Sequence, residues 1–257
     1  MIGMPALIEF ESFEENAKLC QELGLDFIEI NMNLPIYNQF INIEEIKRCI
    51  AKYDIKLTMH LSETFDPFEL DPVIRNARIK SFTYAVERAN DLGVDLLNMH
   101  MSKGIHFTLP NQKLFLYEKY IEDYLNYVKE FKKIVDDLGV KLCIENTGIH
   151  NLEFIKRATD ILLDSDNIFL TYDIGHDITS GYKDKSYYAG HLNEIIHFHI
   201  HDATTLSNHL ELYMGDLDID YYLKYAKTTC SNCVIEVKSS KELIASIKKI
   251  KDLHLYK

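Results

Sequence analysis

Carboxylate and imidazole side chains stand at the ends of short apolar runs along this chain. In the stretch KLCIENTG, residues 141 to 148, the run Leu142-Cys143-Ile144 leads directly into Glu145. A carboxylate at the end of a buried strand costs several kcal/mol unless a cation or hydrogen-bond donors meet it. Similar endings occur at Glu9, Glu29, His60, His100, Glu145, Asp173, His199 and Glu236. Oxygen and imidazole ligands suit zinc, manganese or cobalt, so these residues predict a divalent-metal site if the fold brings them together.

The elements that must position these residues begin with a recurring joint between a helix and a strand. It is found in QELGLDFIEINMN at 21 to 33, NDLGVDLLNMHMS at 90 to 102 and DDLGVKLCIENTG at 136 to 148. Glycine after the last helical turn supplies the left-handed cap, and the apolar run that follows is too short for another helix. Each joint therefore predicts a helix followed by a strand.

Extending this pattern predicts eight strands with helices between them. The strands are ALIEF at 6, DFIEIN at 26, KLTMH at 56, LLNMH at 96, KLCIEN at 141, IFLTYD at 168, IIHFHIHD at 195 and CVIEV at 233. Helical periodicity fills most gaps, at 12–23, 42–53, 75–92, 116–138, 151–163 and 241–253. Alternating strands and helices favour a parallel sheet, and eight units in this length predict an α/β fold, a (β/α)8 TIM barrel, as a single domain over residues 1–257.

The strand ends of such a barrel meet at one mouth, where the active site lies. Each residue also has a structural interpretation: His60 as a hydrogen-bonded core histidine, Asp173 as a helix cap and Glu236 as the partner of Lys238. Six successive strands, the third to the eighth, end in a potential ligand, and uncompensated carboxylates would repel one another. This coincidence favours a metal site, with His176 and His209 close by. Five further histidines are expected to be structural or solvent-facing: His106, His150, His191, His197 and His254.

Composition limits the partners of the protein. The chain has 257 residues, 47% of them hydrophobic, and a formal net charge of −12, which repels phosphate backbones and argues against nucleic acid as a partner. No uncharged apolar run reaches the roughly 18 residues of a membrane span. The five cysteines are scattered, and the one close pair, Cys230 and Cys233, is expected to be ordinary buried thiols and not a redox pair. We therefore expect a cytoplasmic protein that binds a small molecule and no membrane; it could form a homo-oligomer.

In the order of its motifs the chain resembles the xylose isomerase-like TIM-barrel superfamily, which includes sugar isomerases, ketose epimerases, inosose-type dehydratases and the endonuclease IV branch. The motifs are TMH, NMH and IEN at the ends of strands 3, 4 and 5, Asp173-x-x-His176, His199-x-x-Asp202, HLELYMGDLD and, in strand 8, IEV. The loop HLELYMGDLD carries Tyr213 where the family usually has glycine.

The resemblance implies roles for individual residues. Glu145, Asp173, His199 and Glu236 would bind one divalent ion, manganese, cobalt or zinc, and Glu145 and Glu236 would act as base and acid on opposite faces of the substrate. His60, His100, His176 and Lys103 would contact the substrate. The implied activity is that of a sugar isomerase or epimerase in carbohydrate metabolism, acting through an enediolate that the metal stabilises. Thr205 stands where ketose epimerases commonly have arginine, which argues against ketose 3-epimerisation itself.

Two other enzyme classes share this scaffold. An endonuclease IV-like phosphodiesterase acting on abasic-site DNA would bind up to three zinc ions, with His60, His100, His176 and His209 as additional ligands. The chain keeps the D-x-x-H-x-x-x-x-G-Y spacing of that branch but lacks its Asp-Arg-His segment. A dehydratase would share the proton-abstraction step. A barrel that keeps a metal only for stability, or serves as a ligand-binding partner, is the non-enzymatic alternative. The loops 62–72 and 102–113, with Phe65, Phe68, His106 and Phe107, would form a lid or pack against the barrel.

Overall fold

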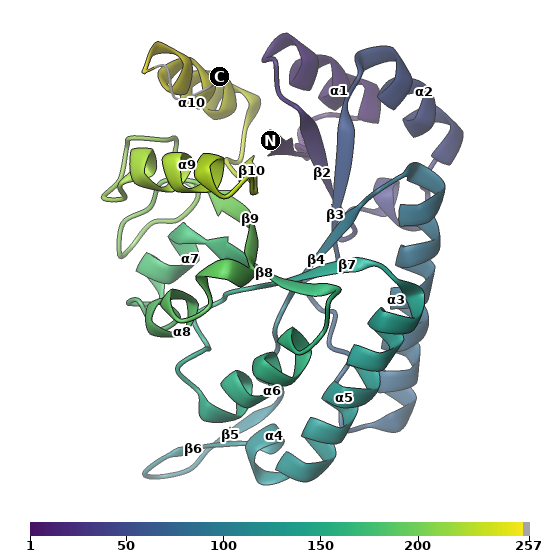
Figure 1. Cartoon of the computed structure of the whole chain (residues 1–257), viewed down its shortest axis with the longest axis vertical. Helices are drawn as coiled ribbons and strands as arrows, with labels where there is room; N and C mark the ends of the chain where they lie inside the picture. The colour runs from purple at the N-terminus through teal and green to yellow at the C-terminus, as the bar shows by residue number, and fades with distance from the viewer. Residues whose placement is uncertain (254–257) are drawn as a thin grey trace.

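Eight parallel strands close into a barrel in the computed structural model, which describes residues 1–253 (Figure 1). Around the barrel the order is β1-β10-β9-β8-β7-β4-β3-β2. The strands are β1 (Ile2–Pro5), β2 (Phe27–Asn31), β3 (Lys56–His60), β4 (Leu96–His100), β7 (Lys141–Glu145), β8 (Ile168–Asp173), β9 (Ile195–Ile200) and β10 (Asn232–Ile235). The expected (β/α)8 barrel is confirmed.

Helices cover the outside of the barrel (Figure 1). The longer ones are α1 (Phe13–Glu22), α2 (Ile43–Tyr53), α3 (Pro72–Leu92), α5 (Ile121–Leu138), α6 (Glu153–Leu163), α9 (Ile219–Thr228) and α10 (Ser240–Asp252). Shorter helices are α4 (Leu116–Lys119), α7 (Ile174–Thr179) and α8 (Lys185–Ala189), with 3-10 turns at Pro35–Tyr37 and Leu192–Glu194. None of the helices within residues 1–253 is long and apolar enough to cross a membrane.

The three Leu-Gly joints adopt the backbone that they predict. Gly24, Gly93 and Gly139 have φ values of 66°, 68° and 62°, and each lies between a helix and the next strand. This left-handed region is open to glycine without the steric cost that a side chain adds. The glycines therefore end α1, α3 and α5 at the points from which β2, β4 and β7 enter the barrel.

The first strand was expected in the wrong place. The structure puts β1 at Ile2–Pro5, before the run ALIEF, and Gly3 explains why it lies there. A Cβ atom on Gly3 would lie 2.6 Å from the carbonyl oxygen of Phe27, so only glycine allows β1 to pair this closely with β2. Glu9 consequently lies outside the barrel mouth, where its carboxylate accepts the backbone N–H of Ser240 at 2.6 Å. It belongs to the start of α10 and not to the candidate site.

The region from 102 to 120 also differs from expectation. Within the predicted loop 102–113 and just beyond it, β5 (His106–Thr108) and β6 (Lys113–Phe115) form an antiparallel hairpin, which lies beside α4 and α6 in Figure 1. The helix predicted over 116–138 is interrupted at Tyr120, between α4 and α5. Tyr117 stacks on Tyr124 and donates to buried Asp66 at 2.8 Å, so packing against the loop after β3 decides where this helix breaks.

The interior of the barrel is polar toward the ends of its strands. Buried polar residues there include Glu29, Thr58, His60, Asn98, Glu145, Thr171, Asp173, His197 and His199. Thr171 donates to Asn98 at 2.7 Å, which shows that these groups form a connected network and not isolated buried polar atoms. The strand register places His100 beside Glu145 and Asp173 beside His199. The barrel therefore brings the predicted ligands of neighbouring strands into contact.

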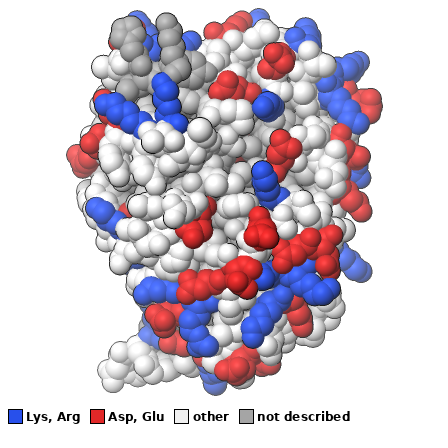
Figure 2. Space-filling model, in the orientation of Figure 1, with Lys and Arg blue, Asp and Glu red and all other residues white. Residues whose placement is uncertain are grey.

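Basic and acidic side chains alternate over the face shown in Figure 2. On α5, for example, Lys133 lies 2.8 Å from Asp137 and Lys132 lies 3.9 Å from Asp136. Exposed pairs of this kind contribute between 0 and about 1 kcal/mol each. The charge on this face is therefore mixed, without a broad basic stripe of the kind that follows a nucleic-acid backbone.

Candidate metal centre

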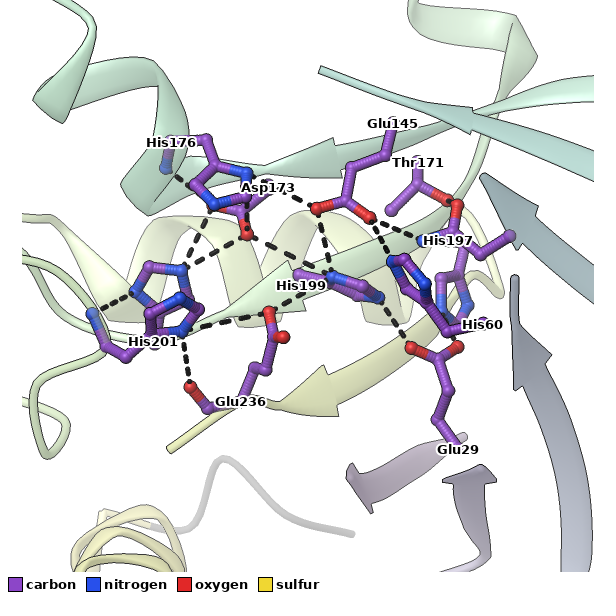
Figure 3. A network of polar contacts seen from close by, with 12 residues as sticks. Glu29, His60, Glu145, Thr171, Asp173, His176, His197, His199, His201 and Glu236 are labelled. Carbon is purple, nitrogen blue, oxygen red and sulfur yellow. Dashed lines mark hydrogen bonds and ion pairs between the residues drawn. The ribbon is translucent and has the colours of Figure 1, made fainter. Parts of the chain in front are cut away.

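Glu145 lies at the centre of the polar cluster (Figure 3). Its side chain is 1% exposed at the end of β7. Asn98 Nδ2 lies 2.5 Å and His60 Nε2 3.3 Å from its Oε2, and one ring nitrogen from each of His100, His176 and His199 lies 3.3 Å from its Oε1. Burial alone would raise the pKa of this carboxyl, but the charges of His199 and His100 hold it well below its ordinary range. Glu145 is thus an ionised carboxylate surrounded by nitrogen.

Asp173 and His199 complete a tight group with Glu145. One ligand atom from each of these three residues lies within 4.8 Å of the others. The fourth predicted ligand, Glu236, follows β10, and its Oε2 lies 3.1 Å from Nδ1 of the same His199 ring. The structure therefore places the other three predicted ligands around the imidazole of His199. The four residues lie at or directly after the ends of four neighbouring strands.

Two of these groups lack hydrogen-bond partners among the described residues. Neither ring nitrogen of His199 nor Glu236 Oε2 has a hydrogen bond at an acceptable angle, although all three atoms are buried. The short contacts of His199, 2.9 Å to Glu29 and 3.1 Å to Glu236, are therefore charge contacts and not well-directed hydrogen bonds. Buried polar atoms without partners are costly, and a bound cation would satisfy these three. The residues fit a divalent cation bound by carboxylate oxygens and imidazole nitrogen.

A second group of potential ligands joins the first at Glu145. It consists of His60, His100 and Glu145, again within 4.8 Å. His60 Nδ1 lies 2.6 Å from the carbonyl oxygen of Leu61, which makes Nδ1 the donor. His60 Nε2 then faces the Glu145 carboxylate, and this contact is favourable when Nε2 carries a proton or when a cation lies between the two groups.

His100 lies between two carboxylates. Its Nδ1 is 2.8 Å from Glu63 Oε2, and its Nε2 faces Glu145. Burial would lower the pKa of His100, but the charges of Glu145 and Glu63 hold it well above its usual range. His176 behaves in the same way: burial opposes its charge, yet Asp173 and Glu145 raise its pKa to about 10. In the absence of a metal ion, protons on these rings balance the carboxylates.

The loop after β9 brings a third group to the mouth. His201, His209 and Glu236 have ligand atoms within 4.8 Å of one another. His209 has a φ of 54°, and its Nδ1 lies 3.2 Å from the backbone oxygen of Glu236. Tyr213, which stands where the resemblance leads one to expect glycine, has a φ of 66°. The loop therefore keeps a left-handed backbone at this position without glycine.

Lys103 and the phenylalanines of the loops 62–72 and 102–113 lie outside the group formed by Glu145, Asp173, His199 and Glu236. Lys103 is exposed, and it lines a cavity of about 320 Å³ together with His100, Glu63 and Thr147. On the other side, a cavity of about 440 Å³ is lined by Glu236, His209, Lys238 and the amides of Asn31 and Asn33 among others. Phe65 and Phe68 are buried in the core, whereas Phe107 is 54% exposed on the hairpin. Of the loops 62–72 and 102–113, only 102–113 has a phenylalanine that is exposed to solvent.

Several members of the network had no predicted role. They are Glu63, which contacts His100, Asn98 on Glu145 and His201 on Asp173. Glu29 was named among the strand ends but was given no role of its own, and it contacts His197 and His199. His197, which was expected to be structural or solvent-facing, is buried and takes part in the network through Glu29. Glu29 and His201 carried a signal, since one ends a strand and the other belongs to the run HFHIHD. His106, His150 and His191 lie apart from the cluster, and His254 lies outside the described residues.

Comparisons with known proteins agree with this fold. The family model described as "Xylose isomerase-like TIM barrel" matches residues 17–253. Among curated proteins, the uncharacterized protein MJ1311 of Methanocaldococcus jannaschii is 25% identical over 251 residues, covering 89% of this chain and 80% of the relative.

Solved structures share the fold over nearly the whole chain. A D-tagatose 3-epimerase-like protein is 21% identical, covers 99% of both chains and has a TM-score of 0.74. The IolI protein, solved with a bound zinc atom, is 18% identical, covers 99% of this chain and 96% of its own, and also has a TM-score of 0.74. Sugar epimerases and a probable dehydratase are among the other structures with this fold. At these identities the likeness shows the fold, and the residues of the site must carry the chemistry.

Proposed function

Because the chain belongs to the xylose isomerase-like TIM-barrel family, we propose that it is a divalent-metal-dependent isomerase or epimerase of a small polyhydroxylated carbonyl compound. Glu145, Asp173, His199 and Glu236 would hold the ion. The observation that carries the proposal is the approach of two carboxylates to one imidazole nitrogen. Glu145 Oε1 lies 3.3 Å and Glu236 Oε2 lies 3.1 Å from His199 Nδ1. Two carboxylates beside a substrate carbonyl can serve as base and acid in a proton transfer.

The two carboxylates have different surroundings. Both oxygens of Glu145 face nitrogen donors and its side chain is 1% exposed, whereas the Glu236 side chain is 27% exposed and its Oε2 has no hydrogen-bond partner among the described residues. A bound divalent ion would polarise the carbonyl group and its neighbouring hydroxyl. Glu236 is then the freer group to remove a proton from the adjacent carbon, and Glu145 would act on the other face. His176 and, from the adjacent cavity, Lys103 would contact substrate oxygens.

Solvent deuterium exchange tests this proposal across a panel of candidate substrates. The metal-loaded protein is incubated in D2O with aldoses, ketoses, cyclic polyhydroxy ketones and keto-glycosides, and ¹H NMR follows the hydrogen next to the carbonyl. We expect loss of that signal together with a new sugar isomer. Loss of water from the substrate would instead identify a dehydratase. Exchange should be absent in Glu236→Gln and retained in Glu9→Gln, whose carboxylate lies outside the cluster.

A second candidate function is favoured by the additional ligand groups. His60, His100 and Glu145, together with His201, His209 and Glu236, would allow more than one ion beside the first. A multi-zinc phosphodiesterase acting on abasic-site DNA uses such a cluster to bind both sides of a transferring phosphate. Elemental mass spectrometry on protein purified without chelator distinguishes the two. About one ion per chain supports the isomerase or epimerase, while about three zinc ions with cleavage of abasic-site DNA support the nuclease.

A further inference from the structure

His201 is the third histidine of the run HFHIHD and lies just beyond β9. Its side chain is fully buried, and its ring lies between Asp173 and the loop that carries His209 (Figure 3). No ligand or catalytic role follows for it from the motif His199-x-x-Asp202, in which it is one of the two unspecified positions. Its contacts nevertheless place it directly against a proposed metal ligand.

The hydrogen bonds of His201 determine which ring nitrogen carries the proton. Nε2 lies 3.1 Å from Oδ1 and 3.2 Å from Oδ2 of Asp173, and because an ionised carboxylate only accepts, Nε2 carries a hydrogen and donates it. Nδ1 lies 3.1 Å from the backbone nitrogen of His209, whose N–H donates to it in the neutral ring, and 3.3 Å from the backbone oxygen of Asp202, which would accept from it in the doubly protonated ring. Both nitrogens of the ring are engaged, and its N–H is directed at the carboxylate.

Asp173 is held on one side by these donors. The backbone N–H of His176 also donates to Oδ1, at 2.6 Å, so Oδ1 receives two donors. Oδ2 is the oxygen on the side of the other ligands, 4.0 Å from His199 Nδ1 and 3.4 Å from His176 Nδ1. The His176 amide thus occupies Oδ1, and the His201 N–H lies against both oxygens and holds the carboxylate in this orientation.

We propose that His201 is a positioning residue for Asp173: it donates to the carboxylate and holds it in the orientation in which Oδ2 faces the bound ion. The inference rests on the proposed function, because it takes Asp173 to be a metal ligand. Groups that orient metal ligands in this way commonly affect metal affinity by about 10- to 100-fold.

Gly175 provides the space that this arrangement needs. A Cβ atom at position 175 would lie 1.8 Å from Cε1 and 2.4 Å from Nδ1 of His201. Both distances are far below van der Waals contact, so any side chain at this point of α7 would displace the ring. The requirement for glycine here comes from the imidazole and not from a left-handed backbone.

The competing role for His201 is as a ligand of a further ion with His209 and Glu236. It would require a free lone pair on one ring nitrogen. Nδ1 already lies against the His209 amide and the Asp202 carbonyl, and Nε2 already donates to Asp173. The contacts therefore favour the positioning role, and the metal content of variants separates the two.

Two substitutions separate the acceptor role of the His201 ring, at Nδ1, from its donor role, at Nε2. In His201→Asn the side-chain oxygen replaces Nδ1 as acceptor for the His209 amide, but no donor reaches Asp173. In His201→Gln the amide nitrogen replaces Nε2 as donor to Asp173. Zinc affinity by chelator competition, zinc content by elemental analysis and the melting temperature are measured for both, and for Gly175→Ala, which should behave like His201→Asn.

We expect the zinc Kd to rise about 10- to 100-fold in His201→Asn and to remain within about threefold of wild type in His201→Gln, at unchanged zinc content. Equal affinity in His201→Asn and wild type would overturn the proposal, as would the loss of one zinc ion per chain. In the zinc-loaded protein, ¹⁵N NMR should show the Nε2–H tautomer of His201; the Nδ1–H tautomer would reject the positioning role by itself. A wild-type protein that binds no divalent ion would refute the proposed function, and with it the role toward the metal.

Discussion

Glu236 Oε2 and His199 Nδ1 lie 3.1 Å apart at the barrel mouth, and neither atom has a well-directed hydrogen bond among the described residues. His199 lies in β9, and Glu236 directly follows β10, the strand that pairs with β9. A buried carboxylate and a buried imidazole without other partners are stabilised when a cation binds both. The stability of the protein should therefore depend on metal.

Metal removal is expected to lower the melting temperature. Saturation at 100 times Kd stabilises a protein by about 2.7 kcal/mol, which corresponds to roughly 5 to 10 °C for a chain of this size. Scanning calorimetry of chelator-treated protein with and without zinc, manganese or cobalt measures the shift. His199→Ala serves as control and should show almost none. Equal melting temperatures for wild-type protein with and without every metal would contradict the prediction.

Glu145→Gln is expected to abolish turnover and leave the fold intact. The substitution keeps the size of the side chain but turns an NH2 group toward the nitrogens that now face a carboxylate. Loss of an acid or base typically reduces the rate about 10²- to 10⁴-fold. The activity is measured on the substrate identified by deuterium exchange, with circular dichroism to verify folding. Near-normal turnover would rule out the catalytic role of Glu145.

His100→Ala tests whether the second group holds an ion. His100 lies between Glu145 and Glu63, and its removal leaves the His60 group with a single imidazole. If this group binds metal, the content should fall by about one ion per chain in elemental analysis. His106→Ala, on the hairpin, is the matched control and should keep the wild-type content. An unchanged metal content in His100→Ala would reject a second ion at this position.

Asp184 is expected to stabilise the loop after β7 in a pH-dependent way. Its carboxylate accepts the backbone N–H groups of Gly148 at 2.5 Å and His150 at 2.7 Å. Burial alone would raise the pKa of Asp184, but the His150 side chain and these amides outweigh it and hold the pKa below its ordinary value. The stabilisation is therefore present above the unfolded pKa of about 3.9 and is lost as the pH falls through the lower native value.

Urea denaturation of Asp184→Asn measures this effect. At pH 7 the variant should lose about 2 kcal/mol, the typical cost of a hydrogen-bonded buried charge. The difference from wild type should shrink below pH 4. Asp137→Asn, which removes an exposed partner of Lys133, should change stability by less than about 1 kcal/mol. A difference that grows on acidification would show that the native pKa of Asp184 is not lowered.

Much of the fold could be predicted because its signals are local. The three Leu-Gly joints depend on one backbone conformation each, and the strand runs that follow them are confirmed. The first strand could not be placed in this way. Ala6 and Leu7 are buried, but in a loop, and apolar burial alone does not distinguish a packed loop from a strand. The close approach of Gly3 to Phe27, which decides the pairing, is a contact between segments far apart in the chain.

The candidate site likewise has a part that local sequence signals predict and a part that depends on contacts between distant segments. The sequence by itself determined the types of candidate ligand and the strands that carry them, because parallel strands of a barrel end at a common mouth wherever their helices pack. The tertiary structure decided which atoms meet. Glu29, Asn98 and His201 hold their partners through strand register, a β-bulge after Leu170 and a loop with left-handed residues at His209 and Tyr213. Such contacts depend on the orientation of side chains from several segments at once, and residue type and spacing along one segment do not specify it.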